Sequence, residues 1–138
     1  GLVHYDIKPS NIVLGRGDND GHVYLIDFGL AVRWTLDSQS GGPRGTVHYS
    51  SLRILDGKAP LPRDDLESLA YTVARLLTGS LPWASWSSKQ RLDGGAVNGR
   101  ELFPGYPDMF AEFTDFARGL SSTDNLQYQR WRQAFRGL

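Results

Sequence analysis

Apolar residues in the second half of the chain recur with the spacing of amphipathic helices. Over residues 64–77 they lie at i, i+3, i+4 and i+7, behind acidic residues that suit the first turn of a helix. Gly79 and Pro82 then end the pattern. A similar face follows Asp108, which can cap a helix, and another lies within residues 125–136. The apolar residues of these predicted helices are Leu66, Leu69, Ala70, Val73, Leu76 and Leu77; Phe110, Phe113, Phe116, Ala117 and Leu120; and Tyr128, Trp131, Ala134 and Phe135.

The front of the chain has a different pattern. Two short apolar runs, Asn11–Leu14 and Val23–Ile26, flank a polar, glycine-rich turn at 15–21, which predicts a β-hairpin whose second strand is buried. Residues 29–63 lack sustained periodicity and are expected to form a long irregular segment, and residues 84–104 are ambiguous. The predicted fold class is therefore mainly α (α+β), with a two-stranded insert at the front of several packed helices.

Length and composition fit one domain, residues 1–138, with an ordinary globular content of 40% hydrophobic and 22% charged residues. Lysine plus arginine equals aspartate plus glutamate at 15 each, so no global charge favours nucleic acid or an anionic membrane as a partner. The absence of cysteine excludes disulfides, thiolate zinc sites and thiol catalysis. No apolar run approaches the ~20 residues of a membrane span, and no signal peptide opens the chain. We expect an intracellular protein of the cytoplasm or nucleus.

Candidate chemistry lies in two short stretches near the front, Asp6-Ile7-Lys8-Pro9-Ser10-Asn11 and Asp27-Phe28-Gly29. Phosphoryl transfer needs an acceptor hydroxyl held in line with the γ-phosphate and metal ions that neutralise the phosphate oxygens. Asp6 can accept a hydrogen bond from such a hydroxyl, and Lys8 can reach the phosphate. Asn11 and Asp27 offer the hard oxygen atoms that Mg²⁺ prefers, while Pro9 restricts the loop backbone.

These stretches carry a family resemblance, and further blocks in the same order extend it over nearly the whole chain. His4–Asn11 and Leu25–Ala31 resemble the eukaryotic protein kinase superfamily. The later blocks resemble its casein kinase I group: Gly45-Thr46-Val47-His48-Tyr49-Ser50-Ser51, Arg63-Asp64-Asp65-Leu66-Glu67-Ser68-Leu69, Gly79-Ser80-Leu81-Pro82-Trp83 and Gly105-Tyr106-Pro107. The resemblance implies a protein serine/threonine kinase that uses ATP and Mg²⁺ and acts on a Ser/Thr hydroxyl of a protein substrate.

For the nucleotide site, the resemblance implies that Asp6 is the catalytic acid/base and that Lys8 contacts the phosphate. Asn11 and Asp27 become magnesium ligands. Val13 matches the floor under adenine, and Ile26 matches the back of that pocket.

The resemblance also implies supporting roles around these residues. Thr46 matches the threonine that bonds to the catalytic aspartate and lysine, and Asp65 matches the helix aspartate that fixes the backbone of the catalytic loop. His4 is expected to pack beneath Phe28, which with Gly29 completes the triplet begun by Asp27.

Tyr5 departs from the family, because most kinases have an arginine there that grips a phosphorylated activation loop. We therefore expect that phosphorylation of Thr35, Ser38 or Ser40 does not raise activity.

A second departure is that no glycine-rich phosphate loop, strand lysine or hinge is found in the sequence. We expect the chain to be a C-terminal kinase lobe, from the catalytic loop onward, that lacks an N-terminal lobe and is inactive without it. A non-catalytic interaction module, either a pseudokinase or an orphan lobe, remains the alternative.

Overall fold

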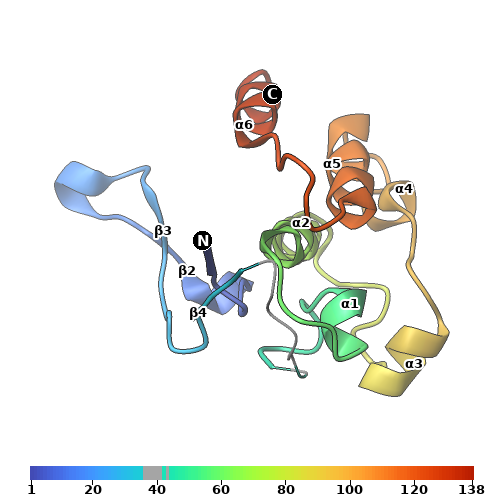
Figure 1. Cartoon of the computed structure of the whole chain (residues 1–138). Helices are drawn as coiled ribbons and strands as arrows, with labels where there is room; N and C mark the ends of the chain where they lie inside the picture. Colours follow the sequence, from blue (N-terminus) through green and yellow to red (C-terminus); the bar gives the residue numbers. More distant parts are fainter. Residues whose placement is uncertain (36–41, 43) are drawn as a thin grey trace.

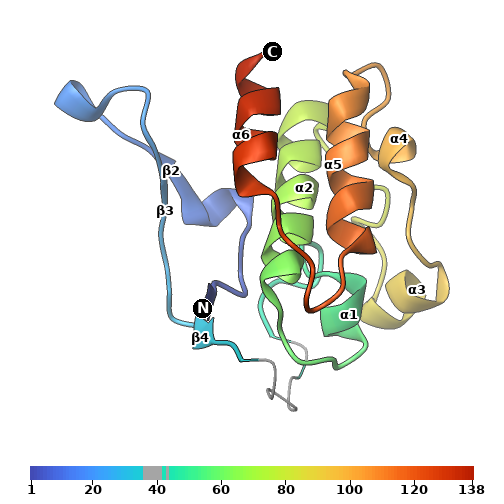
Figure 2. The ribbon, with the colours of Figure 1, turned by 45° about the horizontal axis from the view of Figure 1, so that its top comes forward.

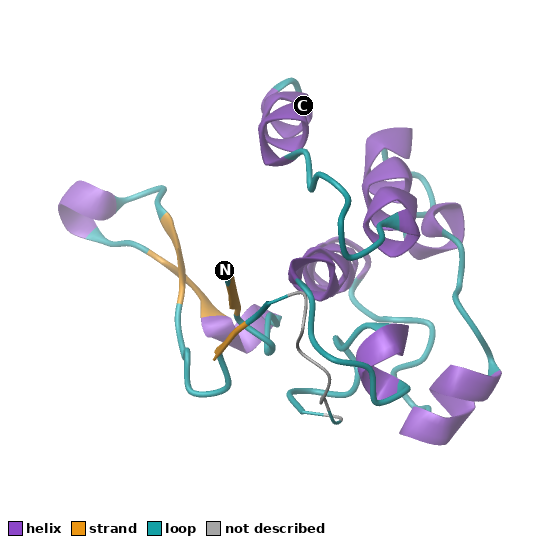
Figure 3. Cartoon of the chain, in the orientation of Figure 1, coloured by secondary structure: helices purple, strands orange, loops and turns teal. Residues whose placement is uncertain are grey.

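Helix α2 (Pro62–Thr78) is the central element of the molecule, and the other helices are arranged around it (Figures 1 and 2). The computed structural model describes residues 1–35, 42 and 44–138, so Ser38 and Ser40 lie outside the described residues. Within this part the chain is mostly helical, as predicted, and the strands are confined to its front (Figure 3). The elements are β1 (Leu2–Val3), η1 (Pro9–Asn11), β2 (Ile12–Leu14), η2 (Gly17–Asn19), β3 (Val23–Leu25), β4 (Val32–Arg33), α1 (Leu52–Leu55), α2, α3 (Ser88–Asp93), α4 (Gly99–Leu102), α5 (Asp108–Gly119) and α6 (Tyr128–Arg136).

Two apolar clusters surround α2. In the first, Leu66 and Ala70 pack against residues of α5 and α6, and the rings of Phe113 and Trp131 meet edge to face at 5.1 Å. The second cluster lies on another side of α2 and contains Tyr71, Ala74, Leu81, Trp83, Leu102 and Phe103. The predicted periodicity of α2 is therefore confirmed at its centre, but Leu76 near its end is 63% exposed. Gly79 ends the helix in the left-handed conformation (φ 82°).

The predicted hairpin is present, with β2 and β3 antiparallel and Val13 opposite Tyr24. The prediction that its second strand is buried is wrong, because Val23 is 65% exposed and Ile26 is 41% exposed. The reason is visible in Figure 1, where the hairpin extends away from the helices, so that backbone pairing rather than a core holds its two strands together.

The expectation of an irregular segment over 29–63 is also wrong in part. Strand β4 pairs antiparallel with β1, with Val3 opposite Val32, and α1 begins after Ser51, whose hydroxyl accepts a hydrogen bond from the amide of Ile54. A strand of two residues and a helix of four are too short to produce a visible periodicity, so the sequence pattern missed both.

The ambiguous stretch 84–104 contains the short helices α3 and α4. At Gly99 the two helices α4 and α5 approach so closely that an added Cβ would lie 2.5 Å from the carbonyl oxygen of Ala111. Asp108 is the first residue of α5 rather than its cap, which is Pro107.

Of the helices in the described part of the chain, none has the length and apolar character needed to span a bilayer.

Candidate active site

The loop that follows β1 is attached to the first turns of α2 through one carboxylate. Asp65 accepts hydrogen bonds from the backbone amides of His4 (2.7 Å) and Tyr5 (3.0 Å). Burial raises the pKa of Asp65, and the two amide hydrogen bonds offset only part of that effect. These contacts fix the loop backbone immediately before Asp6.

Asp6 lies at the centre of a set of polar contacts and is only 8% exposed. Its Oδ1 accepts hydrogen bonds from the amide (3.0 Å) and the hydroxyl (2.9 Å) of Thr46, and its Oδ2 lies 2.7 Å from Nζ of Lys8. Lys8 Nζ also donates to the Thr46 hydroxyl at 2.9 Å. Burial opposes ionisation of Asp6, but the hydrogen bonds from Lys8 and Thr46 outweigh it and lower the pKa of Asp6. The carboxylate is therefore held ionised and oriented.

Gly45 allows Thr46 to contact Asp6, although the two residues are far apart in the sequence. It has a left-handed backbone (φ 75°), and a Cβ added there would lie 2.4 Å from the carbonyl oxygen of Tyr5 and 3.2 Å from Oδ1 of Asp6. Only a residue without a side chain lets the backbone pass this close to the loop. Thr46, the next residue, can then reach Asp6.

Asn11 is buried within η1 and faces the same aspartate. Its side-chain amide nitrogen donates to the carbonyl oxygen of Asp6 (2.8 Å) and to Oδ2 of Asp6 (3.2 Å). Both hydrogen bonds use the nitrogen, so the amide oxygen is the atom of this side chain that can serve as a ligand. Pro9 begins η1, where its restricted backbone suits the first position of the turn.

Asp27 is placed next to this loop by its neighbours on both sides. The Ile26 amide donates to the carbonyl of Asn11 (2.9 Å), and the Ile26 carbonyl lies 3.1 Å from Nε2 of His4. On the other side the ring of Phe28 meets the buried ring of His4 edge to face at 4.8 Å. Asp27 itself has a left-handed backbone (φ 63°), and its Oδ1 accepts a hydrogen bond from the Gly29 amide at 3.2 Å.

The oxygen atoms of Asn11 and Asp27 fit the metal that the sequence implies. Both are hard donors, and incomplete coordination by the protein suits Mg²⁺, which keeps water and phosphate oxygens as further ligands. Within the described residues no cluster of three or more histidines and carboxylates forms a self-contained metal site.

Val13 and Ile26, the residues expected to line an adenine pocket, lie on β2 and just beyond β3. Both side chains are partly exposed, and other apolar side chains of the hairpin and of the segment after it are exposed too: Leu14, Val23, Tyr24, Leu25, Phe28 and Leu30. Their role in nucleotide binding stays a prediction.

A family model described as protein kinase domain matches residues 1–132. The chain belongs to the protein kinase domain family. Members of this family generally use ATP and Mg²⁺.

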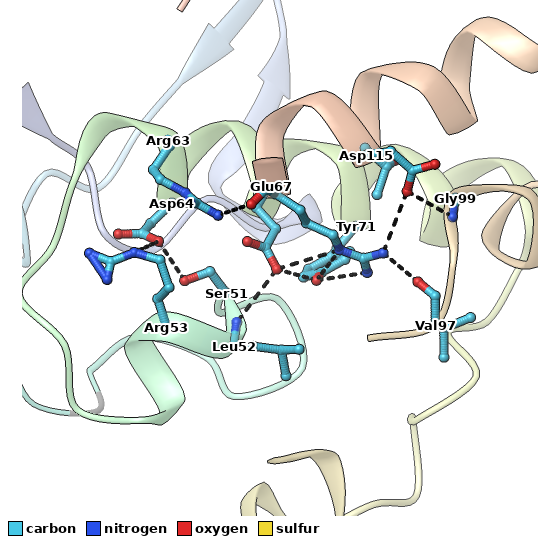
Figure 4. Close-up of polar contacts among 12 residues, drawn as sticks. Ser51, Leu52, Arg53, Arg63, Asp64, Glu67, Tyr71, Val97, Gly99 and Asp115 are labelled. Carbon is cyan, nitrogen blue, oxygen red and sulfur yellow. Dashed lines mark hydrogen bonds and ion pairs between the residues drawn. The ribbon is translucent and has the colours of Figure 1, made fainter. Parts of the chain in front are cut away.

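The sequence did not predict how the segment after Thr46 is held. Figure 4 shows that it is attached to α2 by two further carboxylates. Asp64 accepts a hydrogen bond from the Ser51 hydroxyl (2.7 Å), and Glu67 lies 3.5 Å from the amide of Leu52. Aspartate and glutamate are mostly solvent-exposed in folded proteins, so no sequence signal identified Asp64 and Glu67 as buried anchors.

Glu67 belongs to a larger buried network between α2 and α5. It is 2% exposed and accepts a hydrogen bond from the Tyr71 hydroxyl (Figure 4). It also lies 3.8 Å from Nε of Arg118. Arg118 in turn donates to Tyr71 (3.0 Å) and to the carbonyl of Val97. Burial, followed by the charge of Glu67, raises the pKa of Tyr71, so its hydroxyl stays protonated.

Proposed function

We propose that this chain is the C-terminal lobe, residues 1–138, of a casein kinase I-like serine/threonine protein kinase. It would transfer the γ-phosphate of Mg-ATP to a Ser/Thr hydroxyl of a protein substrate. The observation that carries the proposal is the arrangement at Asp6, whose carboxylate is fixed by Lys8, Thr46 and Asn11 around one point. A lysine two residues after the catalytic aspartate is the pattern of serine/threonine kinases.

In this proposal Asp6 orients the substrate hydroxyl and accepts its proton, a role for which an ionised carboxylate is required. Its lowered pKa keeps it ionised at neutral pH. Lys8 neutralises Asp6 and, because its Nζ also reaches Thr46, lies on the side where the segment after Gly45 would present a substrate. That position suits an ammonium group that contacts the transferred phosphate.

Asn11 and Asp27 would hold magnesium through their side-chain oxygens, and the metal would supply charge neutralisation at the phosphate oxygens. The protein's part is to keep these two side chains in place. The Ile26 contacts with Asn11 and His4 do so for Asp27, and the hydrogen bonds to Asp6 do so for Asn11.

Two apolar surfaces support the proposal that an N-terminal kinase lobe and its connecting segment complete the enzyme. One is the hairpin around Val13 and Ile26, where adenine would lie. The other is a groove of about 1100 Å³ between the hairpin turn and the helices. Its lining includes the apolar side chains of Leu66, Leu69, Phe113, Trp131 and Phe135, together with His22, Arg132 and Arg136. The proposal includes action inside the cell, in the cytoplasm or nucleus, where Mg-ATP is available.

The test is phosphate transfer from radiolabelled Mg-ATP to a peptide library by the full-length natural protein. Asp6→Asn and Asp27→Asn should each lower kcat by about a hundredfold or more, since each removes a group that acts on the reacting atoms. Asp56→Asn, which changes an exposed carboxylate 60% accessible to solvent, should leave kcat unchanged. EDTA should abolish transfer.

The alternative is an interaction module without catalysis, for which the exposed apolar groove would be the binding surface. Wild-type protein that transfers no phosphate, or that loses nothing in Asp27→Asn, would favour that alternative.

A further inference from the structure

Tyr5 has an unusual backbone for its residue type. Its φ is 74°, in the left-handed region that favours glycine, and its ring is buried beside Val3 and Ile54. A bulky residue persists in such a conformation only when its surroundings hold it there. Tyr5 therefore marks a point where several contacts converge.

Three contacts fix this residue, each to a different part of the chain. Its amide donates to Oδ1 of Asp65 on α2 at 3.0 Å. Its carbonyl oxygen faces Gly45 so closely that no Cβ fits between them. Its hydroxyl donates to the carbonyl oxygen of Gly42 at 2.8 Å. The last two contacts both join the catalytic loop to the chain that leads into Thr46.

We propose that Tyr5 is a positioning residue, whose hydroxyl fastens the chain at Gly42 to the catalytic loop and so sets Thr46 against Asp6. The proposal rests on the proposed function, because it assigns a regulatory property to that site: the segment is ordered by a neutral hydrogen bond and needs no phosphate. In this arrangement the side chain of Tyr5 acts through the segment and does not touch the reacting atoms.

The ionisation behaviour of the Tyr5 hydroxyl suits a stable hydrogen bond to the Gly42 carbonyl. Burial raises the pKa of the Tyr5 hydroxyl, although the Gly42 hydrogen bond and the charge of Arg44 oppose that rise. The hydroxyl is therefore a protonated donor at neutral and mildly alkaline pH. The contact depends neither on a charged partner nor on modification of Thr35, Ser38 or Ser40.

The experiment compares Tyr5→Phe with Tyr106→Phe in the full-length natural protein. Both variants remove only a hydroxyl that donates to a backbone carbonyl; Tyr106 donates to Leu77 at 2.5 Å, at the end of α2. Tyr5→Phe should speed hydrogen exchange of the Thr46 amide, which is bonded to Asp6, by about fivefold, the effect of losing one hydrogen bond. Tyr106→Phe should leave that exchange rate unchanged.

Steady-state kinetics supply a second measurement, because general destabilisation of the protein would not change the peptide and Mg-ATP parameters separately. Tyr5→Phe should lower kcat/KM for the peptide about fivefold and leave the KM for Mg-ATP unchanged, because Val13, Ile26 and Asp27 do not depend on the segment. If neither variant nor wild type transfers phosphate, the proposed function fails, while the exchange rates still decide the role of Tyr5.

A measurement on the wild type covers the case in which Tyr5→Phe does not fold. The Tyr5 hydroxyl proton should exchange slowly enough to be seen by NMR and should lie close to the Hα protons of Gly42. The proposal is overturned if that proton is absent or distant from Gly42. An unchanged Thr46 exchange rate in a folded Tyr5→Phe protein, or an equal change in Tyr106→Phe, overturns it as well.

Discussion

The front of the molecule and its helical body are stabilised in different ways. In the body, α2, α5 and α6 bury apolar clusters and a charged network around Glu67. At the front, residues 1–35 carry most of the candidate catalytic groups, but the hairpin leaves its apolar side chains exposed. The front is positioned mainly by hydrogen bonds, and two of these end on Asp65 of α2.

The difference shows where the geometry of the site comes from. Asp64, Asp65 and Glu67 all lie in the first two turns of α2, and together they bind two segments that are far apart in the sequence. Asp65 holds the loop that contains Asp6, whereas Asp64 and Glu67 hold the chain that follows Thr46. A rigid helix thus sets the distance between two loops that meet at Asp6, so that the contacts around Asp6 are positioned although the front has little apolar packing.

The largest effect on stability should come from the charged network in the body. Glu67→Gln leaves Arg118 without its buried counter-charge, and breaking such a pair costs about 3 kcal/mol of unfolding free energy. Denaturant unfolding measures this loss.

Lys89→Gln is the matched control, since it breaks an exposed i,i+4 pair with Asp93 whose side chains are 82% and 63% accessible. That change should cost about 0.5 kcal/mol or less. Equal losses in the two variants would show that the body does not depend on its buried charges as we argue.

A smaller loss of stability is expected at Gly45, where the chain that leads into Thr46 passes close to the loop at the front. Gly45→Ala introduces a Cβ into the gap beside the Tyr5 carbonyl and should destabilise the fold by about 2 kcal/mol. It should also lower kcat, because it displaces Thr46 from Asp6. Unfolding and steady-state kinetics on the same preparation test both effects.

Gly57→Ala separates the two causes of that loss. Gly57 has nearly the same backbone (φ 76°), but a Cβ there meets nothing within 4 Å. Its substitution should cost only the left-handed backbone preference, about 1 kcal/mol, with kcat unchanged. If Gly57→Ala lowers stability and kcat as much as Gly45→Ala does, the close approach of Gly45 to the loop does not explain the losses in Gly45→Ala.

Periodicity and turn residues were sufficient to predict the long elements. Leu66, Ala70 and Phe113 follow the helical repeat and are buried, and the runs around Val13 and Tyr24 do form a hairpin. The short pairing of β1 with β4 had no pattern to reveal it, because two residues define no period and their partners lie some thirty positions apart.

Burial was harder to predict than element type. An apolar run such as Val23–Ile26 reads as a buried strand, yet its exposure depends on which neighbours cover it. Conversely, Glu67 is a charged residue that is almost fully buried, because Arg118 from another helix lies beside it. The candidate residues of the site were predicted from a motif, but the contact of Tyr5 with Gly42 had no sequence signal.

The central claim is that Asp6, Asn11 and Asp27 face one metal–nucleotide site. Paramagnetic relaxation by Mn²⁺-ATP tests it directly, because Mn²⁺ broadens only the NMR signals of nearby nuclei. In the full-length natural protein we predict that Mn²⁺-ATP erases the side-chain amide signal of Asn11 and the backbone signal of Gly29, whose amide donates to Asp27, while Gly57 is spared. Asp27→Asn should restore both signals. Persistence of the Asn11 and Gly29 signals in the wild type at saturating Mn²⁺-ATP would contradict the account.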